Sequence, residues 1–360
     1  MPVSISDVAR RAEVSITTVS HALSGKRPVS DDAKQRITRA IAELDYVPGA
    51  SARNLREGRT RMIALIVPEI GNHFFGQLAR GAEDAANARD HGLVLCNSGG
   101  SPQRERRYLE LLRGRTVDGV VYVAGSYAPP GGQLQAAAGR HEVVLADEFT
   151  PGLDGIPLVT ADNLSGGRMI GELFRELGHE HALVITGPRG LRSVEDRLRG
   201  FAAVYPQAVV REGDFTEAAG ERLVIEALES GIPFTAVFAL NDLMAIGVLN
   251  ALAGRGVAVP DELSVAGFDD IGSAALVRPT LTTVRQPAEE IGREAIALLI
   301  DRLHGERLDA PDAEVLPVRL MRRGSTGPAP ARAAAPPAAA SPVTPAAPSA
   351  APPPTRGPRA

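Results

Sequence analysis

Apolar residues recur at three- and four-residue spacing in three short stretches near the start of the chain, which is the pattern of small amphipathic helices. A serine precedes each stretch, namely Ser4, Ser15 and Ser30, and a serine hydroxyl can accept a hydrogen bond from a free N–H group of the first helical turn. Ser4 also forms a capping-box sequence with Asp7, three residues further on. The sequence therefore predicts three capped helices joined by short turns.

The second of these helices, expected over residues 16–23, divides its side chains between two faces. Val19 and Leu23 form the inward set. The outward set is unusual for a face that only meets solvent, because it combines an apolar residue with polar ones: Ile16, Thr17 and His21. Two helices joined by a short turn and braced by a third form a helix-turn-helix.

From residue 62 onward, short apolar runs alternate with helical stretches, which predicts parallel sheets covered by helices on both faces. The expected strands are residues 62–67, 93–96, 119–123, 143–146, 182–186, 209–212, 236–239 and 264–266. Roughly ten strands in all exceed one comfortable sheet, so we expect two lobes with a cleft between them. Ligands of such sheets bind beyond the carboxyl ends of the strands, which makes the cleft the expected ligand site.

Residues 5–12, 14–23 and 46–56 resemble the start of regulators of the LacI/GalR (lactose repressor) family, and the resemblance extends to about Arg323. It implies an all-α helix-turn-helix DNA-binding domain with a hinge helix, followed by an α/β two-lobed effector domain like the periplasmic binding proteins, with parallel sheets. It also implies a homodimer that presents one recognition helix to each half of a palindromic operator in double-stranded DNA.

The resemblance places the DNA contacts by position. Ile16, Thr17 and His21 would face base edges in the major groove. Thr18, Ser20 and Arg27 would lie nearer the sugar-phosphate backbone. One departure is Glu13, where the family often has glycine; a positive φ at this residue would cost about 1 kcal/mol.

Residues 50–56 separate this family from other helix-turn-helix proteins, because seven residues are too few for a helix to persist alone in water. In the family, two hinge helices pair in the minor groove and each inserts a leucine between base pairs. Leu55 matches that position, and Arg53 and Arg56 flank it as phosphate partners. The alternative is a flexible linker whose Leu55 packs on the next domain.

The resemblance also implies a set of effector-binding residues, which are Asn72, His73, Phe74, Ser126, Asp147, Arg197, Phe215, Asn241, Asp269 and Gln286. Arg197, Asn241 and Asp269 would hydrogen-bond a small polar ligand, and Phe215 would stack on its ring. Such a cleft suits a sugar, because a hydroxyl donates to a carboxylate and accepts from a guanidinium at once. Taken alone, Asp147 and Asp269 could equally be helix caps or surface carboxylates, and Arg197 an ion-pairing helix residue.

Composition agrees with DNA binding by one domain only. Residues 1–60 hold ten Lys and Arg against seven Asp and Glu, whereas the whole chain has a net charge of −4. The single Cys96 excludes a disulfide within the chain and is expected to be buried, and no cysteine cluster offers a zinc site, so no cofactor is expected. The start of the chain lacks the pattern of a signal peptide and no apolar run approaches eighteen residues, which predicts a cytoplasmic protein without membrane contact.

An enzyme is not expected, because the phosphate-loop, dinucleotide and nucleophile-elbow motifs are missing from the sequence. His179 and His181 surround Glu180 in what we interpret as a polar turn before a strand. A cytoplasmic sugar-binding protein or solute receptor without a transcriptional role is the alternative. The N-terminal DNA-reading pattern and the missing export signal argue against it.

The sequence thus predicts a helix-turn-helix domain over residues 1–48, a hinge over 49–60, an effector-binding and dimerisation domain over 61–325 and a disordered Ala/Pro-rich tail over 326–360. The tail lacks leucine, so it cannot form the leucine heptads that assemble tetramers. The expected function is transcriptional repression by a dimer, switched by a small polar ligand that is a sugar or a similar metabolite.

Overall fold

The computed structural model of the chain describes residues 3–25, 27–46, 59–114, 116–125, 131–139, 141–149, 152–153, 155–309 and 312–330. The chain divides into two units, and each consists of several segments. Unit 1 comprises Met1–Asp162, Leu191–Ser193 and Pro287–Pro317, and unit 2 comprises Asn163–Gly190, Val194–Gln286 and Val318–Ala360.

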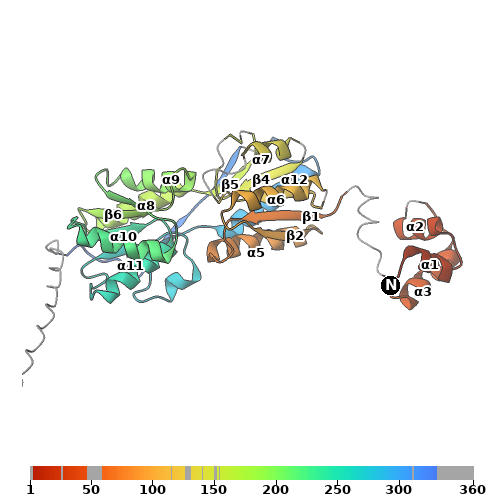
Figure 1. Cartoon of the computed structure of the whole chain (residues 1–360), viewed down its shortest axis with the longest axis horizontal. Helices are drawn as coiled ribbons and strands as arrows, with labels where there is room; N and C mark the ends of the chain where they lie inside the picture. Colours follow the sequence, from red (N-terminus) through yellow and green to blue (C-terminus); the bar gives the residue numbers. More distant parts are fainter. Residues whose placement is uncertain are drawn as a thin grey trace, which may run out of the picture. The chain divides into compact units, whose positions relative to one another are not determined.

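The first described segment, residues 3–46, folds into the three predicted helices: α1 (Ile5–Arg11), α2 (Ile16–Ser24) and α3 (Asp31–Glu43) (Figure 1). Their caps are the expected ones. The Asp7 carboxylate accepts from the backbone N–H of Ser4, and the Ser15 and Ser30 hydroxyls accept from N–H groups in the first turns of α2 and α3.

A small apolar core joins these three helices. Val8, Val19 and Ile37 are each at most 2% exposed, one from each helix. Leu23 is 38% exposed, so its prediction as an inward residue is wrong, and Ala22 packs against this core instead. Both residues lie within one turn of Val19, and Leu23 stands at the C-terminal end of α2, one residue before its last residue.

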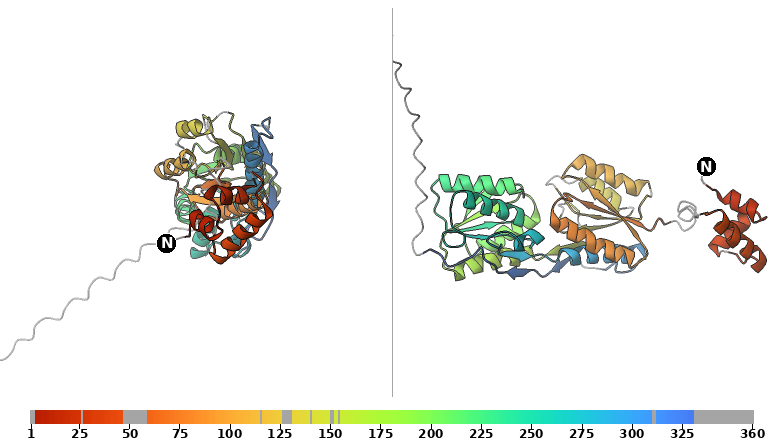
Figure 2. Two further views of the ribbon diagram at one scale, coloured as in Figure 1. Left: turned by 90° about the vertical axis from the view of Figure 1, so that its right-hand side faces the viewer. Right: turned by 90° about the horizontal axis from the view of Figure 1, so that it is seen from below.

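The α/β part of unit 1 is a sheet covered on both faces by helices (Figure 2). The described residues contribute six parallel strands in the order β11-β5-β4-β3-β1-β2. These strands are β1 (Met62–Val67), β2 (Gly92–Asn97), β3 (Gly119–Tyr122), β4 (Glu142–Ala146), β5 (Leu158–Ala161) and β11 (Ala313–Leu316). The helices are α5 (His73–Asn87), α6 (Pro102–Arg113), α7 (Gly131–Ala138) and α12 (Ala288–Leu303).

The central strands of unit 1 are buried on both faces, which explains why they are continuous apolar runs in the sequence. Tyr122 is fully buried and donates to the Glu105 carboxylate, which lies 3.0 Å away. Cys96 is a buried free thiol, as expected. Strands β5 and β11 were not predicted; β11 alternates between exposed and half-buried residues, as an edge strand does.

Two helices of unit 1 that are far apart in the sequence, α5 and α12, cross at a pair of glycines. A Cβ on Gly81 would lie 1.9 Å from the Glu289 carbonyl oxygen, and one on Gly292 would lie 2.0 Å from the Leu78 carbonyl oxygen. Real side chains cannot approach a backbone this closely. Each helix therefore depends on a glycine of its own to admit the backbone of the other.

Unit 2 has a second sheet with helices on both faces (Figure 2). The described strands of this sheet are parallel, in the order β7-β6-β8-β9. Unit 2 also contains a separate antiparallel pair, β10 with β12. The strands are β6 (Ala182–Thr186), β7 (Val209–Glu212), β8 (Ala236–Ala239), β9 (Ser264–Ala266), β10 (Thr283–Arg285) and β12 (Arg319–Met321). The helices are α8 (Asn163–Glu176), α9 (Arg192–Ala202), α10 (Glu217–Glu229) and α11 (Asp242–Gly254), with a short 3-10 helix at Gly272–Ala275.

His179 lies between a turn and strand β6, as interpreted, but its side chain is buried in unit 2. It is 4% exposed, its Nδ1 lies 2.8 Å from the Thr235 hydroxyl and its Nε2 lies 3.0 Å from the Ser264 hydroxyl. Burial lowers the pKa of the imidazole. Two hydroxyls can satisfy a buried histidine, and no pattern local to His179 reveals them, because both come from distant strands.

The chain continues in contact with unit 2 beyond the predicted domain end. The Gly327 N–H donates to the Ser264 hydroxyl, and the Ala329 N–H donates to the Leu177 carbonyl, so these two residues of the expected tail contact unit 2. Residues 331–360 lie outside the described part of the chain. Among the described helices, none has the length and apolar character needed to cross a bilayer.

Candidate functional site

The predicted recognition helix α2 presents a partly apolar surface. Ile16 is 51% exposed, and Thr17 beside it is exposed too. The Thr18 hydroxyl lies 2.8 Å from the Ser15 hydroxyl, so Thr18 also belongs to the helix cap. Ser20 and His21 are half-buried, and Arg27 is exposed just after the helix. Ile16 and Thr17 are therefore exposed in the first turn of α2. In helix-turn-helix proteins, the N-terminal residues of the recognition helix contact the base edges.

The turn before α2 contains the predicted departure from the family pattern. Glu13 has a φ of 54°, in the left-handed region that glycine tolerates best. The predicted hinge residues Arg53, Leu55 and Arg56, and the predicted effector residue Ser126, lie outside the described residues.

The predicted effector residues in the α/β part divide between the units. Asp147, Asn241 and Asp269 come shortly after parallel strands, whereas Arg197 lies on α9 and Gln286 follows β10 of the antiparallel pair. In unit 1 each of these residues has a local role of its own. The Asn72 side chain accepts from the Phe74 N–H at 3.0 Å and caps α5. Phe74 is 3% exposed and packs edge-on against Phe75, which leaves little of its ring for a ligand. Asp147 follows β4 with a φ of 63° and is half-buried.

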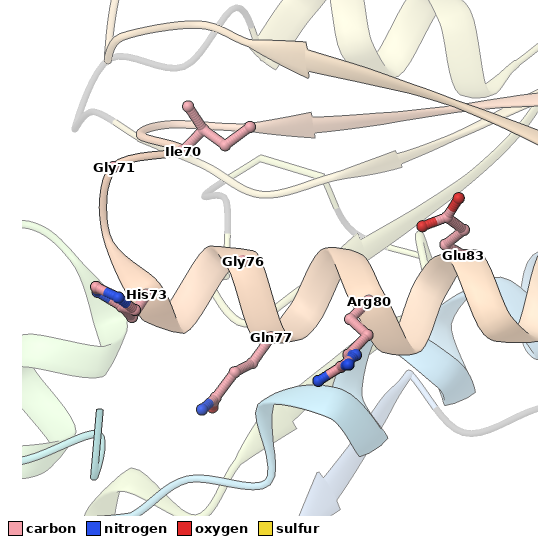
Figure 3. A pocket seen from close by; sticks show the side chains of 7 residues that line it. All are labelled: Ile70, Gly71, His73, Gly76, Gln77, Arg80 and Glu83. Carbon is pink, nitrogen blue, oxygen red and sulfur yellow. The ribbon is translucent and has the colours of Figure 1, made fainter. Parts of the chain in front are cut away.

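His73 lines a surface pocket of unit 1 that runs along α5 (Figure 3). His73, Gln77 and Arg80 project from one side of the helix, while Ile70 and Glu83 lie on the other side of the view. The pocket is therefore formed mainly by one helix and the turn before it. None of the other predicted effector residues that the structure describes lines it.

In unit 2 the predicted residues come together as a buried cluster. Arg197, Asp269 and Gln286 are each at most 7% exposed. The Gln286 Nε2 donates to the Asp269 Oδ1 at 2.7 Å, and the Arg197 NH1 lies 3.9 Å from the same oxygen. The structure thus gathers a guanidinium, a carboxylate and an amide from three separate segments of the sequence.

The Arg197 guanidinium in this cluster is held from several sides. Its Nε donates to the Asn163 Oδ1 at 2.8 Å, its NH1 donates to the Leu240 carbonyl at 2.7 Å, and its Cζ lies 3.9 Å from the centre of the Phe268 ring. A planar cation fixed in this way presents its remaining N–H groups in one orientation. The Gln286 Oε1 is buried and has no hydrogen-bond partner among the described residues.

Asn241 and Phe215, the two other predicted residues of unit 2, are linked to each other. The Asn241 Oδ1 accepts from the Met244 N–H at 2.9 Å and caps α11, while its Nδ2 donates to the Phe215 carbonyl at 3.0 Å. Phe215 has a φ of 67°, and its ring lies so close to Gly187 that a Cβ there would approach the ring to 2.1 Å. Asn241 therefore acts chiefly as a support for Phe215 and α11.

Asp242 is a buried residue of this cluster that the sequence reasoning missed. It is 0% exposed, accepts from the Ile271 N–H at 2.8 Å and accepts from the Thr283 hydroxyl. Burial, followed by the negative charge of Asp269, raises the pKa of Asp242 well above its usual range. The sequence feature that could have revealed Asp242 is its position directly after the predicted Asn241, at the start of α11.

Glu148 is a second missed residue, and it belongs to unit 1. Its carboxylate accepts from the Arg192 N–H at 2.7 Å and from the Ser193 hydroxyl, and both residues group with unit 1 although their neighbours in sequence group with unit 2. Burial raises the pKa of Glu148 to about 7. A carboxylate directly after Asp147 was the only sign of it in the sequence.

Comparisons with known proteins agree with this architecture. The family model described as bacterial regulatory proteins, lacI family, matches residues 4–49, and the model of a periplasmic binding protein-like domain matches residues 172–326. The ribose operon repressor of Halalkalibacterium halodurans is 35% identical over 326 residues, which cover 89% of this chain and 96% of that protein.

Two solved structures are similar to the chain. A LacI family transcriptional regulator from Enterococcus faecalis V583 with bound ribose has a TM-score of 0.67 and 32% identity, over 74% of this chain and 99% of that one. The Lac repressor dimer bound to operator and the anti-inducer ONPF has a TM-score of 0.80 over 91% of this chain and 100% of that one. At 24% identity, this second likeness shows the fold alone.

An N-terminal helix-turn-helix followed by a periplasmic-binding-protein-like α/β part defines a class of DNA-binding transcriptional regulators. The chain belongs to the LacI family of bacterial regulatory proteins. The family and fold class predicted from the sequence are therefore confirmed. The prediction that the protein is not an enzyme is also confirmed, because its relatives are transcriptional repressors.

Proposed function

We propose that the chain is a transcriptional repressor that binds a palindromic operator as a homodimer and is switched by a small polar ligand, a sugar in the first instance. The observation that supports the ligand class is the buried cluster of Arg197, Asp269 and Gln286. A sugar hydroxyl can donate to the Asp269 carboxylate and accept from the Arg197 guanidinium at the same time. The ribose bound to the related regulator supports the same class of ligand.

On the DNA side, the proposal assigns base contacts to Ile16, Thr17 and His21 and backbone contacts to Thr18, Ser20 and Arg27. The exposed Ile16 supports this assignment, because an apolar side chain on a solvent-facing helix is suited to contact with a thymine methyl group. Arg53, Leu55 and Arg56 of the hinge act in the minor groove, with Leu55 as the wedge between base pairs.

The corresponding domains are the DNA-binding domain at residues 1–48, the hinge at 49–60, the effector-binding and dimerisation domain at 61–325 and the tail at 326–360. We assign the protein to the cytoplasm, with no cofactor. Ligand binding shifts the equilibrium between a state in which the hinge can pair and one in which it cannot. A preference of about 2 kcal/mol for one state changes its weight roughly thirtyfold.

The proposal is tested with the full-length protein in two assays. The first selects duplexes from a randomised DNA library and measures the affinity of the winner by mobility shift. The second measures the melting temperature of the protein with D-ribose, other sugars and purines, because any ligand of the folded state raises it. We expect an inverted-repeat sequence from the first assay and a sugar from the second.

Leu55→Ala is the decisive variant for the DNA side. It should lose much of the operator affinity while sugar binding stays intact, because the wedge acts only on DNA. A protein that binds a sugar yet prefers no duplex over random DNA is the alternative, a sugar-binding protein without a transcriptional role. That result would refute the repressor proposal.

A further inference from the structure

The chain enters the α/β part of unit 1 at residues 59–61, and these residues are bound by a carboxylate from the start of β3. The Asp118 Oδ1 accepts from the Thr60 N–H at 2.7 Å and from the Thr60 hydroxyl at 2.9 Å, and its Oδ2 accepts from the Arg61 N–H at 2.7 Å. We call Arg59, Thr60 and Arg61, with the Asp118 carboxylate, the linker anchor. One side chain thus fixes two consecutive residues of the main chain.

The backbone of the linker anchor turns sharply at the point where it is held. Arg61 has a φ of 54°, a left-handed conformation that is strained for a residue other than glycine. Its N–H donates to Asp118, and its carbonyl accepts from the Gly92 N–H at 2.8 Å. Hydrogen bonds to a charged carboxylate are stronger than those between neutral groups, so they hold this conformation in place. The carboxylate therefore fixes the backbone where the chain enters the α/β part of unit 1.

The linker anchor also contacts the end of α12. The Arg59 guanidinium donates to the carbonyl of Leu303, the last residue of that helix, at 3.0 Å. A cation at this position is favoured by the negative end of the helix dipole. The other end of α12 begins at Ala288, two residues after Gln286, whose amide donates to Asp269. The helix whose end contacts the linker anchor therefore follows Gln286 closely in the sequence.

We propose that Asp118 is a positioning residue for DNA binding, because it holds residues 59–61 to unit 1 and so makes the hinge follow the state of the effector domain. This inference rests on the proposed function. Asp118 touches neither DNA nor ligand in this role. Without its carboxylate, the segment between the two parts of the protein would lengthen by several unanchored residues, and the hinge would no longer sense unit 1.

The test compares operator affinity among full-length variants, with the duplex selected by the wild-type protein. Asp118→Ala should bind that duplex roughly tenfold more weakly or worse, because an unanchored linker must be ordered on binding. The operator affinity of Asp118→Asn should lie between those of the wild-type protein and Asp118→Ala. Its amide oxygen can still accept from Thr60, whereas its NH2 group cannot accept from Arg61. Glu262→Ala is the matched control, because it removes a carboxylate that accepts a backbone N–H of Ala258 at 2.6 Å, in unit 2.

Two further measurements distinguish the positioning role of Asp118 from a purely structural role. The melting shift caused by D-ribose should stay close to wild type in Asp118→Ala, since the anchor does not support the unit 2 cluster, and the loss of operator affinity should exceed any loss of thermal stability. Thr60→Val combined with Asp118→Ala should weaken operator binding no more than Asp118→Ala does alone, because both changes remove the same contact.

Several results would overturn the inference. Wild-type operator affinity in Asp118→Ala would do so, and so would additive losses in the double variant. An equal loss in Glu262→Ala, or a loss of operator affinity that merely parallels a lower melting temperature, would assign the effect to stability. A wild-type protein that prefers no duplex is a different result, because it refutes the proposed function and not the anchor alone.

Discussion

The two α/β units hold their predicted effector residues in different arrangements. In unit 2, Arg197 of α9, Asp269 after β9 and Gln286 after β10 contact one another and are buried. In unit 1, Asn72 caps α5 and Asp147 is half-buried after β4. Unit 2 therefore contains a prearranged cluster, whereas the predicted residues of unit 1 belong to different local structures.

The difference lies in what supports the polar groups. Asp269 and Asp270, two consecutive non-glycine residues of unit 2, have positive φ values of 116° and 58°. Asp270 is clamped by Arg285 and Arg323, each at 2.6 Å, and Asp242 holds the N–H of the next residue, Ile271. A strained loop persists only when its surroundings over-determine it. The support of unit 2 is what we expect of a binding site that is formed before its ligand arrives.

The largest expected effect is the loss of ligand binding in Asp269→Ala. The carboxylate is the shared acceptor of the unit 2 cluster, so removing it should weaken the sugar identified by melting shift by on the order of 3 kcal/mol, or more than a hundredfold. Titration calorimetry measures the loss. Operator affinity without ligand should remain, and a variant that still responds to the sugar would contradict the role of Asp269.

Asp242→Ala should be the most destabilising of the single changes at the two sites, by about 2 to 3 kcal/mol. It leaves the buried Ile271 N–H and Thr283 hydroxyl without their acceptor. Urea unfolding measures the change. Asp242→Asn is the matched control and should lose less, because the amide oxygen still accepts one of these bonds. If both variants unfold like wild type, the loop of unit 2 is supported by other contacts.

Glu148→Gln tests a buried carboxylate of unit 1 through the pH dependence of the free energy of unfolding. Burial raises the pKa of Glu148 from 4.5 to about 7, so between these values the folded protein binds more protons than the unfolded one. The free energy of unfolding contributed by this group therefore falls as the pH rises through that window. Relative to wild type, the variant should gain stability from pH 4.5 to 7, on the order of 2 kcal/mol. A pH-independent difference between the two unfolding curves would show that Glu148 does not titrate there.

Asn72→Ala should have the smallest effect, a loss of about 1 kcal/mol in stability from the missing helix cap. Asn72→Ser is the control, because a serine hydroxyl can accept from the Phe74 N–H in the same way. Thermal unfolding of the two variants measures the difference. A loss of several kcal/mol would mean that unit 1 depends on this side chain as strongly as unit 2 depends on Asp242.

Local patterns were sufficient to predict a large part of the fold. The caps at Ser4, Ser15 and Ser30 act within one turn of chain, and the central strands are buried on both faces, so both features are visible in short windows of sequence. Strands β5, β10, β11 and β12 were missed. β10 pairs with β12 and β11 pairs with β5 across long stretches of sequence, so neither pairing is visible in a short window.

The site shows the same division between local and distant causes. The family resemblance pointed to Arg197, Asp269 and Gln286, and the structure brings them together. It could not reveal the contacts that support them, because Asp242 meets Thr283 across 41 residues of sequence. The same is true of Asp118 and Thr60, and of the buried hydroxyls around His179. Such pairs have no signature in either partner's own neighbourhood.

The crossing of α5 with α12 has a consequence for how the protein is made. The ribosome synthesises the segments of unit 2 that end at Gln286 before it reaches Gly292, which packs on Leu78, and before it reaches β11, which pairs with β5. A nascent chain that ends at residue 286 has an uncovered apolar face on α5 and an open strand edge, both of which invite contact with other chains. The early half of unit 1 therefore waits, while most of unit 2 is made, for the segments that cover α5 and pair with β5.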